Sequence, residues 1–285
     1  MAIESQMPIS RRVIGVAGIL SLSLYAVSAN ATWSPIYAWQ FPPDYTSRLM
    51  QAVVLNPCQP GTPCGDAAAK KYDISPWKVL PNGGMAEVEA AAKARQRAGL
   101  GDYPTDKAAG IAATGYTPSP DVSALVKTQF IKQIDRVVDS DEARKIGTAL
   151  ASRDIVAIWT HGMAPNGLHP NDLADAIASY WILNWMMANH GDLTPVQAQA
   201  VRDQIRAAIV VGRLAALTNV GRQEVAELMM IQFVIHSAIY ETAIKANDAD
   251  LIAKLGDAAE QRFQTEMKID LHTLALTDQG FALKR

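Results

Sequence analysis

The stretch Ile177-Ala-Ser-Tyr-Trp-Ile-Leu-Asn-Trp-Met-Met187 decides the fold, because it is apolar on nearly every face of a helix. A helix that is apolar all round has to be surrounded by other elements. Asn171 or Asp172 is expected to cap its start, and the pattern ends near Asn189. Its length and its aspartates at 172 and 175 indicate a core helix rather than a membrane span.

Helical periodicity continues on both sides of this central helix. Ser119-Pro120 and Thr194-Pro195 each supply an N-cap followed by proline at the first helical position. Further helices are predicted over 120–137, 140–150, 155–159, 195–211, 223–246 and 248–263. Strand-like alternation bounded by turns is not evident in this half, and short connections imply antiparallel neighbours. The sequence therefore predicts an all-α fold, with a helical bundle of about six to seven helices over residues 119–285.

The first 31 residues are typical of a cleavable secretory signal peptide. Arg11-Arg12 supplies the positive charge, and Val13–Val27 is an apolar segment shorter than a membrane-spanning helix. Ala29-Asn30-Ala31 matches the small-x-small pattern of a cleavage site, so we expect cleavage after Ala31. A retained membrane anchor is the alternative, and Ser10-Arg11-Arg12 also raises the twin-arginine route. We favour general secretion to a periplasmic or secreted location, without a lipid anchor because no Cys sits at the cleavage point.

Composition excludes some functions of the exported chain. The net charge of the whole chain is −2, and removing Glu4, Arg11 and Arg12 with the first 31 residues makes it more negative, so the charge is too weak and too mixed for nucleic-acid binding, which calls for a basic face. Apolar residues make up 49% of the chain, enough to build a substantial core. No second apolar run reaches spanning length, so we expect no stable membrane span after cleavage.

Residues 32–118 are expected to form a Pro/aromatic-rich, extended arm that precedes the bundle. Eight prolines within 32–84 preclude long helices, while the interspersed aromatic residues are unlike a freely disordered tail. The arm either lies across the helical body or docks on a partner, such as an envelope protein contacted through residues 32–84. Met85–Ala98 is predicted to be a peripheral helix, and 99–118 a linker rich in Gly, Pro, Thr and Ala.

The only two cysteines, Cys58 and Cys64, are expected to form a local disulfide. Pro60-Gly61 between them favours a turn that brings the sulfurs together in an oxidising compartment. No His lies nearby to complete a zinc site, and the spacing is not that of a Cys-x-x-Cys redox pair. Because this disulfide would close only a short loop, it would hold that loop rather than stabilise the whole fold, and its contribution would be about 2 kcal/mol.

Catalytic motifs are not evident in the sequence. We find no Gly-x-Ser-x-Gly, P-loop, His-Glu-x-x-His or EF-hand, and no Glu-x-x-His of the kind di-iron bundles require. His161 and His169 bracket a Pro/Gly loop before the central helix, with Asp172 beside them. An acid/base or metal site there is one interpretation, and a solvated loop that leads into the helix is the other. We expect no metal and no cofactor.

Trp181 and Asn184, within the central helix, are the remaining candidate binding residues. Asn184 is expected to be buried, where an interhelical hydrogen bond is favoured over a pocket-lining role. Trp181, with the neighbouring tryptophans, would line an apolar pocket if the protein were a small-molecule carrier.

Four stretches resemble an uncharacterised bacterial family of exported proteins, a domain of unknown function. They are Tyr116-Thr-Pro-Ser-Pro120, Asp175-Ala-Ile-Ala-Ser-Tyr-Trp-Ile182, Thr194-Pro-Val-Gln-Ala198 and Leu276-Thr-Asp-Gln-Gly-Phe281. The resemblance covers about residues 115–283 and implies an exported helical domain with no assigned activity. The resemblance supports the helical fold and says nothing of mechanism. From the residues alone, we expect an exported envelope protein that is a non-catalytic binding or interaction module. The alternatives are an enzyme with a site near the His161–Asp172 loop, or a small-molecule carrier with an apolar pocket near Trp181.

Overall fold

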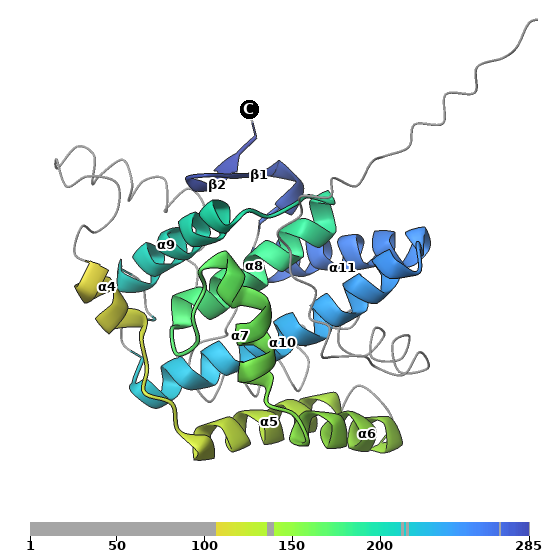
Figure 1. The fold of residues 1–285 in the computed structure, drawn as a ribbon. Helices are drawn as coiled ribbons and strands as arrows, with labels where there is room; N and C mark the ends of the chain where they lie inside the picture. Colours follow the sequence, from red (N-terminus) through yellow and green to blue (C-terminus); the bar gives the residue numbers. More distant parts are fainter. Residues whose placement is uncertain (1–106, 136–139, 212–213, 215–216, 268, 285) are drawn as a thin grey trace, which may run out of the picture. The chain divides into compact units, whose positions relative to one another are not determined.

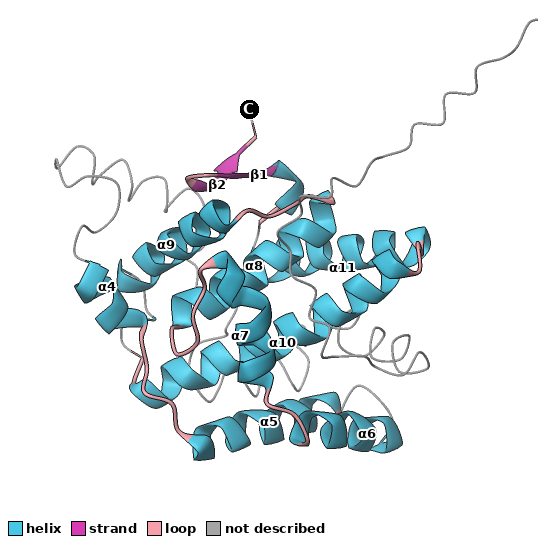
Figure 2. Cartoon of the chain, in the orientation of Figure 1, coloured by secondary structure: helices cyan, strands magenta, loops and turns pink. Residues whose placement is uncertain are grey.

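The computed structural model describes residues 107–135, 140–211, 214, 217–267 and 269–284 (Figure 1). These residues include eight α-helices and one β-hairpin. The α-helices are α4 (Lys107–Thr114), α5 (Pro120–Ile134), α6 (Ser140–Ala151), α7 (Ile155–Met163), α8 (Leu173–Asn189), α9 (Pro195–Val211), α10 (Asn219–Lys245) and α11 (Ala249–Met267). Two 3₁₀ turns, η2 (Ala164–Asn166) and η4 (Leu271–Thr273), and strands β1 (Leu274–Thr277) and β2 (Gly280–Leu283) complete these elements. The predominance of helix in this region, seen in Figure 2, confirms the predicted fold class.

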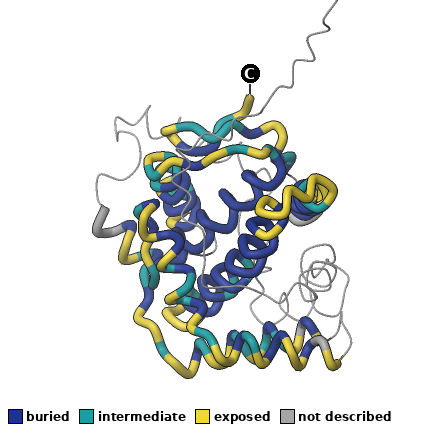
Figure 3. The backbone as a smooth tube through the Cα atoms, turned by 45° about the vertical axis from the view of Figure 1, so that its right-hand side comes forward, coloured by how far each residue is buried: buried dark blue, intermediate teal, exposed yellow. Residues whose placement is uncertain are grey.

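Helix α8 is the central element, as its sequence predicts. Every residue from Leu173 to Ala188 is buried, and α9, α10 and α11 pack against it. Trp159 of α7 is also fully buried, and its Nε1 donates to Oγ of Ser179 at 2.9 Å. The outer helices are amphipathic instead. Figure 3 shows buried and exposed residues alternating along α5 and α6.

Side chains at the helix starts follow the capping rules. Oδ1 of Asp172 accepts from the backbone N–H of Ala174 at 2.8 Å, which confirms this aspartate as the cap of α8. Pro120 and Pro195 stand at the first positions of α5 and α9, as expected. Helix α10 begins earlier than predicted, because Thr218 caps it through the N–H of Gly221.

The predicted linker over residues 99–118 is partly wrong, because residues 107–114 form α4. Arg222 of α10 donates through Nη1 to the carbonyls of Ala112 and Gly115, at 2.9 and 2.8 Å. A Cβ at Gly110 would lie 3.0 Å from Cδ of Arg206, so α4 lies close against α9. Contacts with residues about 100 positions away therefore hold this Ala/Gly-rich helix, and no local pattern reveals them.

The expectation of a C-terminal half without strands is also wrong. Strands β1 and β2 pair antiparallel, with Thr277 opposite Gly280 across a two-residue turn. Gln204 of α9 satisfies the backbone of Phe281, donating to its carbonyl and accepting from its N–H, both at 2.8 Å. The hairpin thus depends on α9, and strands of four residues are too short to show a clear alternation.

Several predictions fall outside the described residues. They are the signal peptide with its cleavage site, the arm over 32–84 with Cys58 and Cys64, and the helix over Met85–Ala98. Among the helices that the structure does describe, none combines the length and apolar character needed to cross a membrane.

Candidate functional site

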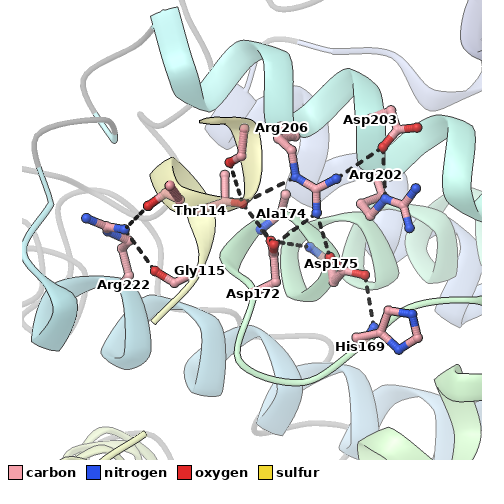
Figure 4. A network of polar contacts seen from close by, with 12 residues as sticks. Thr114, Gly115, His169, Asp172, Ala174, Asp175, Arg202, Asp203, Arg206 and Arg222 are labelled. Atoms are coloured by element: carbon pink, nitrogen blue, oxygen red, sulfur yellow. Dashed lines mark hydrogen bonds and ion pairs between the residues drawn. The ribbon is translucent and has the colours of Figure 1, made fainter. Parts of the chain in front are cut away.

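A buried cluster of charged side chains lies where α8 begins (Figure 4). Nη2 of Arg206, from α9, is 2.9 Å from Oδ2 of Asp172 and 3.1 Å from Oδ2 of Asp175. These side chains are 9%, 10% and 2% exposed, respectively. Charge-assisted hydrogen bonds are strong in such a place, and an unpaired charge would be costly. The three residues therefore form one electrostatic unit that joins α8 to α9.

Neighbouring groups use the other hydrogen-bonding positions of this cluster. Oγ1 of Thr114 donates to Oδ2 of Asp172 at 2.9 Å and accepts from Nε of Arg206 at 3.3 Å. Nη1 of Arg206 lies 3.2 Å from Oδ1 of Asp203. Oδ1 of Asp172 accepts two backbone N–H groups in the first turn of α8. The cluster is thus satisfied by the protein itself, which is typical of a structural joint between α4, α8 and α9.

Asp175 has a perturbed acidity within the cluster. Burial, and then the charge of Asp172, raise the pKa of Asp175 from 3.8 to about 7. The backbone N–H of His169, which donates to Oδ1 at 2.9 Å, and the arginines 202 and 206 act in the opposite direction. Two carboxylates share one guanidinium here, so protonation of Asp175 relieves their mutual repulsion.

The sequence indicated only part of this cluster. Asp172 was among the candidate residues, whereas Thr114 and Arg206 were not. Arg202 and Arg206 are four residues apart on the face of α9 that also buries Ile205, and both are 8% exposed. Arginine is rarely so deeply buried without a partner. An arginine pair on an apolar helix face is therefore the signal that would have pointed to buried carboxylates.

The structure does not bring the two candidate histidines into this cluster. His161 lies in the last turn of α7, His169 lies in the loop before α8, and both are exposed. His169 contributes its backbone N–H to Asp175, as the dashed contact in Figure 4 shows. Within the part of the chain that the structure describes, no group of three His, Cys, Asp or Glu residues is placed to hold a metal ion.

Trp181 and Asn184 lie in the packed interior. The ring of Trp181 is edge-to-face with Phe263 at a centroid distance of 5.0 Å, and Phe281 lies 6.2 Å away. Asn184 donates through Nδ2 to the carbonyl of Tyr180 at 2.7 Å, and its Oδ1 accepts from Nη1 of Arg262 at 2.6 Å. Asn184 thus makes an interhelical hydrogen bond between α8 and α11, the role that the sequence favours.

A groove of about 700 Å³ lies among α5, the start of α7 and α10. Its volume is within the range of small-molecule sites, roughly 300–1,000 Å³. The groove has apolar walls and a few charged groups. The lining residues that matter for its chemistry are Ser123, Lys127, Ile155, Val156, Glu227 and Ile231. No sequence pattern indicated it, because its walls come from three helices far apart in the chain.

Glu227 places a carboxylate in this groove, although the residue is only 5% exposed. Its Oε1 accepts from Oγ of Ser123 and from Nε2 of Gln223, both at 2.8 Å. Oε2 accepts no hydrogen bond from the described residues, yet it is not sealed from solvent. Burial, and then the charge of Glu227, raise the pKa of Tyr116 above its ordinary value. One oxygen of Glu227 is thus fixed by the protein, the other accepts no hydrogen bond from the described residues, and the side chain lines the groove.

Lys127 and the start of α7 form the opposite side of the groove. Nζ of Lys127 donates to the backbone carbonyl of Arg153 at 2.8 Å. Asp154 caps α7 by accepting from the N–H of Ala157 at 3.0 Å. Two basic and two acidic residues therefore line the groove, so its selectivity depends on where each charge lies rather than on net charge.

Fold and groove together define a mostly helical domain that has an open, mixed-charge groove and a C-terminal hairpin among its described residues. The chain belongs to the family of unknown function DUF6683, whose model matches residues 82–284. The match includes all the described helices and begins upstream of the four stretches recognised in the sequence. No curated protein and no solved structure shows a significant match to the chain.

Proposed function

We propose that this chain is an exported, non-catalytic binding protein of the cell envelope, and that its helical domain binds a small ligand in the groove among α5, α7 and α10. The observation that carries this proposal is the buried carboxylate of Glu227, which lines the groove, is held on Oε1 by two hydrogen bonds and accepts none on Oε2 from the described residues. A braced polar group in a partly apolar cavity is the usual arrangement of a ligand site.

Charge placement favours binding over catalysis. The carboxylates at the start of α8 are engaged by Arg206, Thr114 and backbone N–H groups, which leaves little capacity for a reacting group. The nearest histidine, His169, directs its backbone toward them. An enzyme at the His161–Asp172 loop would need an acid/base side chain within hydrogen-bond reach of a substrate.

Export and the envelope location rest on residues 1–31. A charged start, a short apolar segment and a small-x-small end support a cleavable signal peptide, with the cut after Ala31. Cys58 and Cys64 would then form a disulfide in an oxidising compartment.

The arm over residues 32–84 is proposed to contact an envelope protein. Its aromatic residues among prolines support a segment that docks, because such residues seldom persist in a freely solvated chain. Affinity capture from intact envelopes, with the mature protein carrying or lacking residues 32–84, tests this. One partner that is lost with the arm supports it, and identical recovery by both forms contradicts it.

A blocking substitution tests ligand binding by the groove. Val156 lines the groove and is half-buried, so Val156→Trp should fill it. Val210 of α9 is 40% exposed outside the groove, which makes Val210→Trp the matched control. In ligand-observed NMR with small amines, carboxylates and neutral alcohols, we expect compounds that bind the mature protein and Val210→Trp but not Val156→Trp. No binder at millimolar concentration, or equal binding by both variants, would contradict the proposal.

A further inference from the structure

We infer that the ligand of this groove carries a protonated primary amine on an apolar body, and that Oε2 of Glu227 accepts from the ammonium group. The inference rests on the proposed function, because it names the chemical class that the same groove binds.

The carboxylate of Glu227 has no counter-charge among the described residues. Among the described residues, no Lys, Arg or His forms an ion pair with its carboxylate, and its two hydrogen-bond donors, Ser123 and Gln223, are neutral. A buried carboxylate without a counter-charge is unfavourable. A cation that enters the groove would supply that charge.

The hydrogen bonding of Glu227 suits an ammonium group better than a metal ion or a guanidinium. A metal ion needs several oxygen ligands, and no suitable group of acidic residues or histidines occurs among the described residues. A guanidinium is recognised best by two free carboxylate oxygens in a fork arrangement. Glu227 offers one free oxygen, since Oε1 already accepts two hydrogen bonds. This geometry suits the point charge of an ammonium group better than a planar fork.

Apolar side chains line the groove together with the carboxylate of Glu227. Ile231 follows Glu227 by one turn on α10, and Ile155 and Val156 face the groove from α7. These side chains provide an apolar wall for an alkyl chain. The Lys127 ammonium is tethered to the carbonyl of Arg153, on the connection that precedes α7. An amine is therefore expected to bind with its charge at Glu227 and its alkyl chain along Ile155, Val156 and Ile231.

A probe series of equal chain length tests the class of ligand. Isothermal titration of the mature protein would use n-pentylamine, n-pentylguanidine, pentan-1-ol and pentanoate. We expect n-pentylamine to bind most tightly, with n-pentylguanidine weaker and pentanoate weakest. Equal or tighter binding of pentanoate or pentan-1-ol would overturn the inference without any variant.

Charge-removing variants then test the residue. Glu227→Gln keeps an oxygen for Ser123 and Gln223 but removes the charge, so n-pentylamine affinity should fall by about tenfold or more. Glu241→Gln is the control, because Glu241 is on the same helix, is 7% exposed and lies about 21 Å further along it. We expect its affinity to stay within about twofold of the unsubstituted protein.

The two proposals fail in different ways. If Val156→Trp abolishes n-pentylamine binding but Glu227→Gln leaves it unchanged, the amine assignment is wrong and groove binding stands. If neither variant affects binding, or no probe binds, both are wrong. Circular dichroism would check that Glu227→Gln is folded, and the wild-type probe series decides the question if it is not.

Discussion

Arg206 of α9 and Asp172 of α8 lie 2.9 Å apart, Nη2 to Oδ2, at a point where both side chains are about nine-tenths buried. Asp172 also caps α8. The same carboxylate thus starts the central helix and attaches it to a neighbouring one. Local helix formation and tertiary packing are therefore coupled through one side chain.

Removing this guanidinium should be strongly destabilising. Arg206→Met would leave Asp172 and Asp175 buried next to each other without their shared cation, and breaking such a pair typically costs about 3–5 kcal/mol. Urea unfolding followed by circular dichroism measures this. Arg144→Met is the control, because Arg144 pairs with Asp141 on the exposed surface of α6 and its loss should leave the midpoint unchanged. Equal midpoints for the two variants would contradict the account.

Stability should depend on pH through Asp175. The unfolded carboxyl loses its proton near pH 4, whereas burial and the charge of Asp172 raise the folded pKa to about 7. Between these values the folded state binds more protons, so the free energy of unfolding should fall as pH rises from about 4 to 7. Asp175→Asn should flatten that dependence in urea midpoints measured from pH 4 to 8. The same slope in both proteins would exclude Asp175 as its source.

Close packing of α8 against α11 should make Gly256 intolerant of a side chain. A Cβ at Gly256 would lie 2.8 Å from the backbone carbonyl oxygen of Met187, which cannot move without shifting α8. Gly256→Ala should therefore cost about 1–3 kcal/mol, despite the better helix propensity of alanine. At Gly147 the nearest atom is 3.3 Å away and belongs to the side chain of Ile131 rather than to backbone, so Gly147→Ala should cost clearly less. Thermal unfolding of the two variants compares them, and the reverse order would contradict the packing described.

Export should produce a mature chain that starts at Thr32. The small residues at 29 and 31 predict a cut after Ala31, so N-terminal sequencing of protein secreted by a bacterial host should begin Thr-Trp-Ser. Ala31→Arg should block processing, while Ala38→Arg, beyond the cut, should not. Full-length protein retained in the membrane fraction would instead support an anchor.

The central helix was predictable because its evidence is local. The apolar run over 177–187, the cap at Asp172 and the prolines at 120 and 195 each act within one or two turns of their own position. Such features fix where a helix begins and how deeply it is buried without reference to its neighbours.

The hairpin and α4 were missed because their stability comes from distant residues. Gln204 holds the backbone of Phe281 from 77 positions away, and Arg222 holds the end of α4 from more than 100. Strands of four residues and a short Ala/Gly-rich helix carry weak local signals. Their contacts become visible only once the helices are placed.

The groove could not be predicted from the sequence for the same reason. Ser123 and Glu227 are 104 positions apart, and the carboxylate has meaning only when α5 and α10 lie together. In the sequence, Glu224 and Glu227 are adequately explained as acidic residues near a helix start. The structure instead places Glu227 in the third turn of α10, where it lines the groove.

Side-chain amide NMR tests the groove as an amine site most directly. Nε2 of Gln223 donates to Glu227 at 2.8 Å, so its two amide protons should shift when n-pentylamine reaches the carboxylate. The side-chain amide of Asn189, the last residue of α8, is the internal control. It donates to the carbonyl of Leu271 at 3.0 Å, does not line the groove, and should not shift. Saturable shifts at Gln223 alone, lost in Val156→Trp, are the predicted result. Shifts at Asn189 without shifts at Gln223, or none at either, would contradict the groove as the amine-binding site.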